Sequence, residues 1–517
     1  MLELRNITIN LTKTNRVLIN NLNLVFNRGD KIAIIGEEGN GKTTLLQLIY
    51  NHELIDDYCT YSGQIIKKNV NIGYLEQTLN SKWNSHTMLE YLLKNNPEDE
   101  INYDNYNELI QNKKVLSKLG INTNRIDEEQ VIETLSGGEK VKLQLAKIII
   151  NNPDILLLDE PTNDLDISTL EWLEEFINSI DVPILYISHD EVLLEHTANV
   201  IVHLEQIKRK TEAKHTIERI SYNDYIQKRL GMIIKQTQVA RKQRSIHKSK
   251  MERWQQIYQK VEHQQATITR ADPHGAKLLA KKMKSLKSQE KRMENEESNF
   301  LNIPDIEEAI KFNFESNISI PNNKLILDLK LDNLLISDKL LATNINLEVR
   351  GPKHIVIIGE NGVGKTTLFK YIYKQLKNRE DIKIGYMSQN YNESLNANKT
   401  ALEFLLSDTN NYDETRARTL MGCMKFTEEE MVNKVYHLSG GQKAKLFILK
   451  MILDNCDVLL LDEPTRNLSP LSNPIIREVL SNYKGTIISI SHDRKYILEV
   501  CDKTYKLTKT GLIEYEI

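Results

Sequence analysis

The chain has 517 residues, enough for roughly three globular units of about 150 residues, so a single small module is excluded. Its 68 lysine and arginine residues nearly balance its 71 aspartate and glutamate residues. The resulting net charge of −3 argues against a protein built wholly around nucleic acid or an acidic membrane. No apolar run reaches the roughly 18–20 residues of a spanning helix, so we expect a chain that does not cross a membrane.

The number and spacing of the cysteines and the first residues of the chain indicate where in the cell the protein is expected. The four cysteines show neither paired metal-binding spacing nor the density of a disulfide scaffold. The chain opens with a strand-like run instead of a basic start followed by an apolar segment. We therefore expect a cytoplasmic protein that is not secreted.

The chain carries one series of motifs twice, which predicts two copies of one fold. We name residues 1–205 the first copy and residues 301–517 the second copy. In each copy, the aspartate of a Leu-Leu-Leu-Asp-Glu motif stands 23 positions after the serine of a Leu-Ser-Gly-Gly motif. In each copy, the histidine of a Ser-His-Asp motif stands 30 positions after that aspartate. Such matched spacing indicates a duplicated site.

The first copy begins with an apolar, strand-like run at 31–35 followed by a glycine-rich loop with the spacing G-x-x-x-x-G-K-T. In this pattern the backbone amides wrap phosphates, the lysine meets the β- and γ-phosphates, and the threonine hydroxyl faces Mg²⁺. We name this segment P-loop 1 and expect it to bind a nucleoside triphosphate. Its residues are Gly36, Glu37, Glu38, Gly39, Asn40, Gly41, Lys42, Thr43 and Thr44.

Further polar positions follow apolar runs in the first copy. Asp159 ends a leucine-rich run and is expected near the metal with Thr43, and Glu160 beside it is a candidate general base for the attacking water. Gln77 is suited to sensing Mg²⁺ and water, and His189 to contacting the γ-phosphate. The Ser-His-Asp motif is not read as a hydrolase triad, because triad members converge from distant positions.

Residues 206–300 form a basic insert with 23 lysine and arginine residues against 10 acidic ones. Apolar residues at alternating three and four spacings predict a long helix over 226–261, and a shorter stripe predicts a second helix over 279–293. Pro273 and Gly275 between them predict a turn, so we expect an antiparallel helical hairpin. The alternative is a charged hairpin that merely spaces the two copies.

The hairpin has two basic flanks and a tip of different chemistry. The flanks are suited to neutralising RNA phosphates, and the tip, over 262–275, carries polar groups suited to bases or a tRNA end. The flank residues are Arg241, Lys242, Arg244, Lys248, Lys250, Lys277, Lys281, Lys282, Lys284 and Lys287. The tip residues are His263, Gln264, Gln265, Ile268, Arg270 and His274.

The second copy repeats the candidate site. We name its glycine-rich loop P-loop 2, with residues Gly359, Glu360, Asn361, Gly362, Val363, Gly364, Lys365, Thr366 and Thr367. The residues expected near Mg²⁺ are Thr366, Gln389 and Asp462, which correspond to Thr43, Gln77 and Asp159. The residues expected in catalysis are Gln389, Glu463 and His492, which correspond to Gln77, Glu160 and His189.

The two Leu-Ser-Gly-Gly motifs look like the signatures of ATP-binding cassette ATPases. We name Ser136, Gly137 and Gly138 signature 1, and Ser439, Gly440 and Gly441 signature 2. Two cassettes with a basic helical linker and no membrane span resemble the F class of that family, whose members act on ribosomes. The Thr-Arg-Asn-Leu-Ser-Pro run after Glu463 is similar to the antibiotic-resistance branch of Lsa, Vga and Msr type proteins, and most of all to the Lsa-like group.

This resemblance implies an α/β fold with two tandem P-loop ATPase domains, at 1–205 and 301–517, joined by a helical hairpin linker at 206–300. It implies an ATPase that binds ATP and Mg²⁺, with each signature completing the γ-phosphate cage opposite the P-loop of the other copy. Replacement of the family's aspartate by Ser469 alters contacts between the two sites, so we expect unequal hydrolysis rates. Residues 1–25 and 325–350 lack the aromatic residue that usually stacks on adenine, so GTP could substitute for ATP.

The resemblance further implies a monomer without a transmembrane partner that acts on the 70S ribosome. Its linker would enter through the E site, contact 23S rRNA and the peptidyl-site tRNA, and protect against lincosamides, pleuromutilins and group A streptogramins. The main alternative is a housekeeping translation factor of the same class. A transporter subunit leaves the basic hairpin without a role, and the DNA-repair cassette proteins would carry zinc-binding cysteines or a far longer coiled coil.

Overall fold

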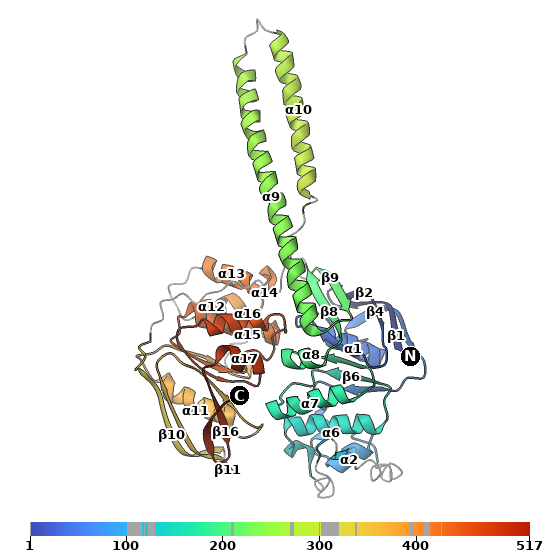
Figure 1. Ribbon diagram of the computed structural model, residues 1–517, viewed down its shortest axis with the longest axis vertical. Helices are drawn as coiled ribbons and strands as arrows, with labels where there is room; N and C mark the ends of the chain where they lie inside the picture. The colour runs from blue at the N-terminus through green and yellow to red at the C-terminus, as the bar shows by residue number, and fades with distance from the viewer. Residues whose placement is uncertain are drawn as a thin grey trace. The chain divides into compact units, whose positions relative to one another are not determined.

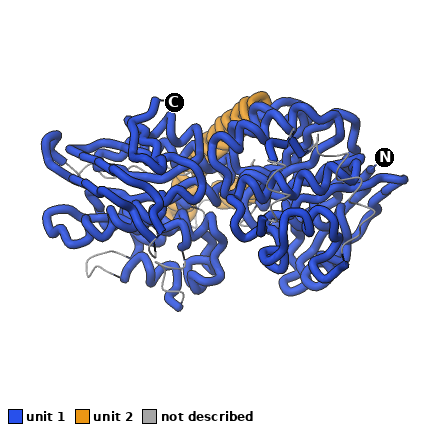
Figure 2. Tube along the Cα trace, turned by 90° about the horizontal axis from the view of Figure 1, so that it is seen from below, with its two compact units in different colours: residues 1–222, 307–517 blue, residues 223–306 orange. Residues whose placement is uncertain are grey.

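The protein is described from a computed structural model (Figure 1). The structure describes residues 2–100, 116–117, 119–121, 130–207, 211–268, 273–298, 300, 320–336, 339–391, 398–407, 414–424 and 426–516. The chain divides into two compact units, residues 1–222 with 307–517 and residues 223–306 (Figure 2). Within these described ranges, no helix is both long enough and apolar enough to span a membrane.

The first copy is built on a six-stranded sheet whose central strands are buried on both faces. Because helices cover both faces, these strands are runs dominated by Ile and Leu instead of alternating sequences. The pairs are parallel except for the last, which is antiparallel. In order across the sheet the strands are β5 (Ile72–Leu75), β6 (Ile155–Asp159), β7 (Ile184–Ile187), β3 (Lys31–Ile35), β8 (Val200–Ile207) and β9 (Glu212–Glu218). The end of β8 and all of β9 lie beyond residue 205, in the range expected for the linker, so the sheet of the first copy extends further along the chain than the motif series indicates.

The second copy has the same sheet order and the same single antiparallel pair at one edge. Its strands are β13 (Ile384–Met387), β14 (Val458–Asp462), β15 (Thr486–Ile490), β12 (His354–Ile358), β16 (Lys503–Thr508) and β17 (Gly511–Tyr515). The α/β class with two tandem copies is therefore confirmed. Leu460, Ile488 and Phe369 lie in its core with no exposed surface.

Helices pack on these sheets and begin where the sequence offers a cap. In both signatures a serine accepts from the backbone of the third helical residue, which closes a capping box. The helices with bounds among the described residues of the first copy are α1 (Lys42–Tyr50), α2 (Met88–Leu93), α6 (Gly137–Ile150), α7 (Ile167–Ser179) and α8 (Glu191–Thr197). Those of the second copy are α11 (Lys365–Lys377), α12 (Ala401–Leu406), α13 (Glu414–Cys423), α14 (Glu428–Val432), α15 (Gly440–Leu453), α16 (Asn473–Ser481) and α17 (Arg494–Val500).

An antiparallel sheet accompanies each copy. In the first copy it has the order β2 (Val17–Val25), β1 (Leu2–Leu11) and β4 (Cys59–Lys67). In the second copy β10 (Leu325–Ile336) pairs with β11 (Lys339–Arg350). Short 3₁₀ turns connect elements at His52–Leu54, Ser81–Trp83, Ile132–Thr134 and Val435–His437.

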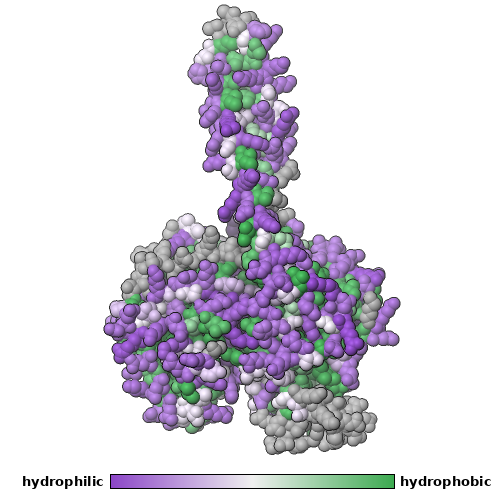
Figure 3. All heavy atoms as spheres, viewed as in Figure 1, coloured by the Kyte–Doolittle hydropathy of each residue, from purple (hydrophilic) through white to green (hydrophobic). Residues whose placement is uncertain are grey.

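The unit over 223–306 contains the expected helical hairpin. Helix α9 (Tyr222–Thr267) and helix α10 (Pro273–Ser298) run antiparallel, side by side (Figure 1). Trp254 Nε1 donates to the Leu286 carbonyl oxygen at 3.0 Å, and His247 Nε2 lies 3.2 Å from the Met293 carbonyl oxygen. Apolar residues follow the line between the helices, while hydrophilic residues dominate the rest of the visible hairpin face (Figure 3). Of the tip residues, Arg270 lies outside the described residues.

Candidate nucleotide-binding sites

The predicted polar positions of the first copy meet at one edge of its central sheet. Strands β5, β6, β7 and β3 are neighbours and parallel, so their carboxyl ends lie together. Gln77, Asp159, His189 and P-loop 1 each follow or end one of these strands. The second copy places Gln389, Asp462, His492 and P-loop 2 in the same way after β13, β14, β15 and β12. Segments far apart in sequence thereby form one site in each copy.

P-loop 1 depends on glycine where the backbone passes close to another strand. Gly36 has φ 144°, and a Cβ there would lie 2.3 Å from the Leu204 carbonyl oxygen. Lys42 is buried, and its Nζ donates to the carbonyl oxygens of Gly36 at 2.9 Å and Glu37 at 3.1 Å. The loop thus curls around its own lysine, which is the shape that presents backbone amides to phosphates.

P-loop 2 repeats this geometry. A Cβ on Gly359 would lie 2.6 Å from the Leu507 carbonyl oxygen. Lys365 is buried and donates to the carbonyl oxygens of Gly359 at 2.7 Å and Glu360 at 2.9 Å. In both loops the glycine before the lysine is the left-handed N-cap of the following helix, so the lysine stands at the helix N-terminus.

A hydroxyl and a carboxylate lie together at the position expected for Mg²⁺. Thr43 Oγ1 donates to Asp159 Oδ1 at 3.1 Å, and Tyr74 OH donates to Asp159 Oδ2 at 3.4 Å. Burial, reinforced by the neighbouring Glu160 charge, raises the pKa of Asp159 to about 6. A cation beside this carboxylate would favour its ionised form, as Mg²⁺ bound between protein oxygens and phosphates would.

The second copy supplies an independent indication for a cation. Asp462 is 1% exposed, and its Oδ2 has no hydrogen-bond partner among the described residues. Burial raises its pKa to about 6. No cluster of three or more His, Cys, Asp or Glu side chains able to hold a metal occurs in the described part of the chain, so phosphate oxygens would have to complete the coordination. Hydroxyl and carboxylate oxygens fit Mg²⁺, which would neutralise phosphate charge when bound.

The two candidate general bases have different surroundings. Glu160 accepts from Gln77 Nε2 at 2.9 Å and Asn163 Nδ2 at 2.7 Å, and its Oε1 lies 3.3 Å from His189 Nε2. Burial alone would raise the pKa of Glu160, but the hydrogen bond and charge of His189, with the bond from Asn163, lower it to about 2.

Glu463 lacks most of these donors. The His492 backbone N–H donates to it at 3.4 Å, and His492 Nε2 is 3.8 Å from its Oε1. Burial and the Asp462 charge raise the pKa of Glu463 to about 8. Burial and the nearby Lys365 charge lower the pKa of His492 to about 3. Arg466, which replaces Asn163, instead pairs with Asp164 Oδ1 at 2.8 Å.

Both glutamates occupy a backbone conformation that is uncommon for non-glycine residues. Glu160 has φ 48° and Glu463 has φ 55°. Such strain costs on the order of 1–3 kcal/mol and persists where the surrounding structure imposes it, often at functional sites. Because the same strained conformation occurs in both copies, we infer that the fold fixes the direction of the glutamate side chain at this position.

P-loop 1 lies against signature 2. The backbone N–H groups of Gly440 and Gly441 donate to the Glu38 carboxylate at 3.3 and 2.8 Å. His189 Nδ1 lies 2.8 Å from the Leu468 carbonyl oxygen, so the histidine of one copy is held by the backbone of the other.

P-loop 2 meets the first copy through Asp164. The Asn361 side-chain amide donates to the Asp164 carbonyl oxygen. A Cβ on Gly137 of signature 1 would lie 2.8 Å from that same oxygen. Ser469, at the position of Asp166, makes a hydrogen bond of 3.0 Å to Ser472 within its own turn.

A cavity of about 380 Å³ adjoins P-loop 2, within the size range of small-molecule sites. Residues of both copies line it, including Lys365, Asp462 and Asp164. Ile336 and Leu341, which the sequence reasoning missed, also line it, and no Phe, Tyr or Trp is among its described lining residues. These aliphatic groups offer a base dispersion contact without the geometry of aromatic stacking. Their only sequence signal is their place in the apolar runs before P-loop 2.

Comparison with known proteins gives the family. A family model described as "ABC transporter" matches residues 19–163 and 342–466, more than half of the chain. The chain belongs to the ATP-binding cassette family. Its two copies are the cassettes, and the protein is an ATPase.

Two relatives indicate the class within the ATP-binding cassette family to which this chain belongs. The "ABC transporter F family member 2" of Arabidopsis thaliana is 27% identical over 94% of this chain and 74% of its own length. The "Ribosome protection protein VmlR" of Bacillus subtilis (strain 168) is 27% identical over 96% of this chain and 85% of its own. The protein is therefore an ATP-binding cassette ATPase of the F type.

A solved structure supports the fold. The archaeal ribosome recycling factor aABCE1, crystallised with the ribosomal stalk protein aP1, aligns with a TM-score of 0.58 and 16% identity. The alignment covers 98% of this chain and 89% of that one. The tandem arrangement of two P-loop ATPase domains is shared.

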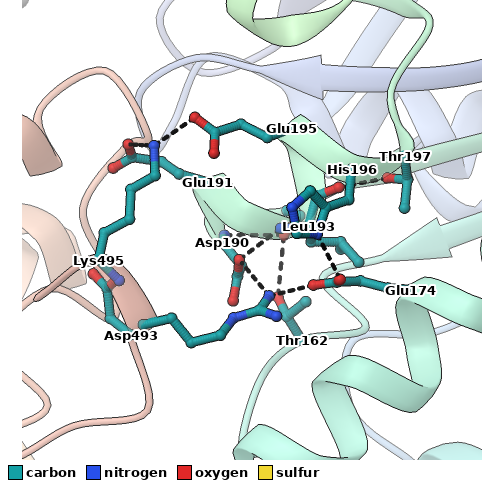
Figure 4. A network of polar contacts seen from close by, with 12 residues as sticks. Thr162, Glu174, Asp190, Glu191, Leu193, Glu195, His196, Thr197, Asp493 and Lys495 are labelled. Atoms are coloured by element: carbon teal, nitrogen blue, oxygen red, sulfur yellow. Dashed lines mark hydrogen bonds and ion pairs between the residues drawn. The ribbon is translucent and has the colours of Figure 1, made fainter. Parts of the chain in front are cut away.

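The two cassettes also meet through a charged network next to the two histidine motifs (Figure 4). Across this contact, acidic side chains on α7 and α8 of the first copy pair with basic ones on α16 and α17 of the second. Lys495 pairs with Glu191 at 3.4 Å and also with Glu195 (Figure 4). Arg477 donates to Glu191 at 2.6 Å, and both side chains are at most 5% exposed. These ion pairs hold the two cassettes together through side chains, without any contribution from a nucleotide.

Proposed function

We propose that this ATPase binds ribosomes in its ATP-bound state and protects the large subunit from antibiotics. The observation that carries the proposal is that each P-loop contacts the other copy while an exposed, strongly basic helical hairpin is inserted between the copies in sequence. The F-type relative named as a ribosome protection protein supports it. The cytoplasm is the corresponding location.

In this proposal Glu160 and Glu463 activate the attacking water, and His189 and His492 contact the γ-phosphate. Thr43, Gln77 and Asp159 hold Mg²⁺ in one site, and Thr366, Gln389 and Asp462 hold it in the other. P-loop 1 works with signature 2, and P-loop 2 with signature 1. The contact of Glu38 with Gly440 and Gly441 supports the first pairing.

The hairpin is proposed to contact 23S rRNA from the E-site side and to disturb the peptidyl-site tRNA and the drug pocket. All ten flank residues are exposed, and among the described residues only Lys250 of this set forms an ion pair, with Glu296 at 3.0 Å. Exposed, uncompensated cations are the groups that RNA phosphates attract. The proposed drugs are lincosamides, pleuromutilins and group A streptogramins.

Co-sedimentation tests the ribosome step. The double variant Glu160→Gln, Glu463→Gln should stay ATP-bound and pellet with 70S ribosomes through sucrose, whereas the same variant with ADP should not. Charge reversal at Lys281 and Lys284 should weaken pelleting, while the matched reversal at the exposed Lys13 and Lys374 should not. A trapped form that remains in the supernatant with ATP contradicts the proposal.

A housekeeping role in translation is the competing function, since F-type relatives without a protection name match equally well. Comparing a deletion strain with its parent separates the two. Protection predicts lower drug tolerance with normal growth in drug-free medium. A growth defect without any change in drug tolerance favours the housekeeping role.

A further inference from the structure

The Glu38 carboxylate in P-loop 1 lies on the backbone amides of signature 2. It accepts from Gly440 at 3.3 Å and from Gly441 at 2.8 Å. Both amides open helix α15, where unsatisfied N–H groups and the helix dipole favour an anion. In the proposed function, these two amides bind the γ-phosphate of ATP. In this structure the carboxylate of Glu38 occupies them instead.

A second acid on the same loop reinforces this contact. Glu37 Oε1 lies 3.4 Å from the Nζ of Lys445, which stands on α15 and is 8% exposed. A buried ammonium needs a nearby anion, so this pair fixes the loop against the start of the helix. Two neighbouring carboxylates therefore hold P-loop 1 to signature 2.

Among its described residues, the second site lacks both contacts, the first through a different residue and the second through a different position of the same lysine. Asn361 stands where the first copy has Glu38, and its neutral amide donates to the Asp164 carbonyl oxygen. Lys142 stands where the second copy has Lys445, and its Nζ lies 4.6 Å from the centroid of the Trp172 ring. Over the described residues, signature 1 therefore has no carboxylate from P-loop 2 on its amides.

We propose that Glu38 is a specificity-determining residue that competes with the γ-phosphate for the Gly440 and Gly441 amides, so that the first site discriminates against triphosphate relative to diphosphate. This inference rests on the proposed pairing of P-loop 1 with signature 2. A γ-phosphate and a carboxylate need the same two N–H donors and repel each other at that distance. A diphosphate on P-loop 1 lacks the group that reaches signature 2, so Glu38 keeps its contact.

The consequence is an intrinsic difference between the two sites. The second site, with Asn361, gains its signature contacts on binding ATP without displacing an anion. The first site must break two charge-assisted hydrogen bonds before it gains the same contacts. ATP therefore closes the second site at a lower concentration than the first.

Equilibrium binding to the full-length chain tests this inference. In a Lys365→Ala background, which weakens the second site, Glu38→Gln should tighten ATP binding to the first site on the order of tenfold, the size of a hydrogen bond to a charged group. ADP binding should change less than about twofold. Equal tightening of ATP and ADP, or no change in either, would overturn the inference.

The reciprocal variant keeps the test decisive if the first background is unstable. In a Lys42→Ala background, Asn361→Asp should weaken ATP binding to the second site while leaving ADP binding nearly unchanged. An unchanged ratio of ATP to ADP affinity would contradict the inference. These binding measurements contain no ribosomes, so they are independent of the pelleting test. An altered ratio of ATP to ADP affinity without ribosome pelleting rejects the proposed function alone. Pelleting with an unaltered affinity ratio rejects this inference alone.

Discussion

At the scale of single residues, the two catalytic-base candidates differ more than their shared motif suggests. Glu160 receives three side-chain contacts, from Gln77, Asn163 and His189. Glu463 receives one weak backbone bond and a longer contact from His492 at 3.8 Å, because the arginine at the position of Asn163 points to Asp164 instead. At neutral pH Glu160, with a pKa of about 2, is ionised and oriented by its donors. Glu463, with a pKa of about 8, is largely protonated at that pH and is therefore less available to accept a proton.

This difference predicts unequal effects of removing each base. Glu160→Gln should lower ATP turnover on the order of a hundredfold, the lower end of what a general base contributes, and Glu463→Gln should lower it less. Steady-state phosphate release at saturating ATP measures both single variants. Equal losses would show that the contacts around the two glutamates do not set the rate.

Two glycines of P-loop 1 give a matched pair of substitutions. Both have positive φ, but a Cβ on Gly36 would strike the Leu204 backbone at 2.3 Å, while a Cβ on Gly39 would meet nothing within 4 Å. Gly39→Ala should cost about 1–2 kcal/mol of stability from backbone strain alone. Gly36→Ala should cost more and abolish ATP binding at this site. Thermal unfolding with and without ATP measures both effects, and equal costs would contradict the predicted steric clash.

At the scale of elements, α8 and α17 connect the two histidine motifs. Asp190 and Asp493 cap these helices directly after His189 and His492. Helix α8 contributes carboxylates and α17 contributes cations, so displacement of one histidine loop strains the ion pairs held by the other (Figure 4). The network is a physical route by which the two ATP sites can affect each other.

Breaking the most buried pair of this network should be costly. Arg477→Ala leaves Glu191 buried without its strongest partner, which should destabilise the protein by about 3–5 kcal/mol. The control is Arg418→Ala, which removes an exposed pair with Glu414 on α13 and should cost less than about 0.5 kcal/mol. Urea denaturation followed by circular dichroism compares them. Similar midpoints for the two variants would show that the buried pair contributes no net stability.

At the scale of the whole molecule, charge is unevenly distributed along the chain. The insert over 206–300 holds 23 basic and 10 acidic residues, although the chain as a whole carries −3. The two cassettes are therefore acidic, and a polyanion is repelled by them and attracted by the insert. The near-neutral total conceals this polarity, which favours contact with RNA through the hairpin.

This uneven charge predicts that ribosome binding weakens as salt concentration rises, and that the lysines of the hairpin cause this dependence. The logarithm of the association constant of the ATP-trapped variant should fall linearly with the logarithm of KCl concentration. Replacing Lys281 and Lys284 by glutamine should reduce the slope by about 2, roughly one for each lost phosphate contact. Sedimentation at several KCl concentrations measures the slopes. An unchanged slope would place the ribosome contact elsewhere on the chain.

The sequence by itself determined the parts of this protein that depend on short-range patterns. The glycine-rich loops, the apolar strands before them and the capped signature helices follow from conformational preferences of a few neighbouring residues. The hairpin follows from apolar spacing and from Pro273, which begins α10. Gln77, Asp159 and His189 can be recognised because each ends or closely follows an apolar strand in a repeated motif.

The tertiary structure alone decided which distant groups meet. Glu38 and Gly441 are 403 positions apart, Arg477 and Glu191 are 286 apart, and His189 and Leu468 are 279 apart. No spacing rule links such positions, because their distance depends on how two independently formed cores pack against each other. The charges of the side chains that come together then stabilise these contacts. Two sites with nearly the same motif therefore have different surroundings.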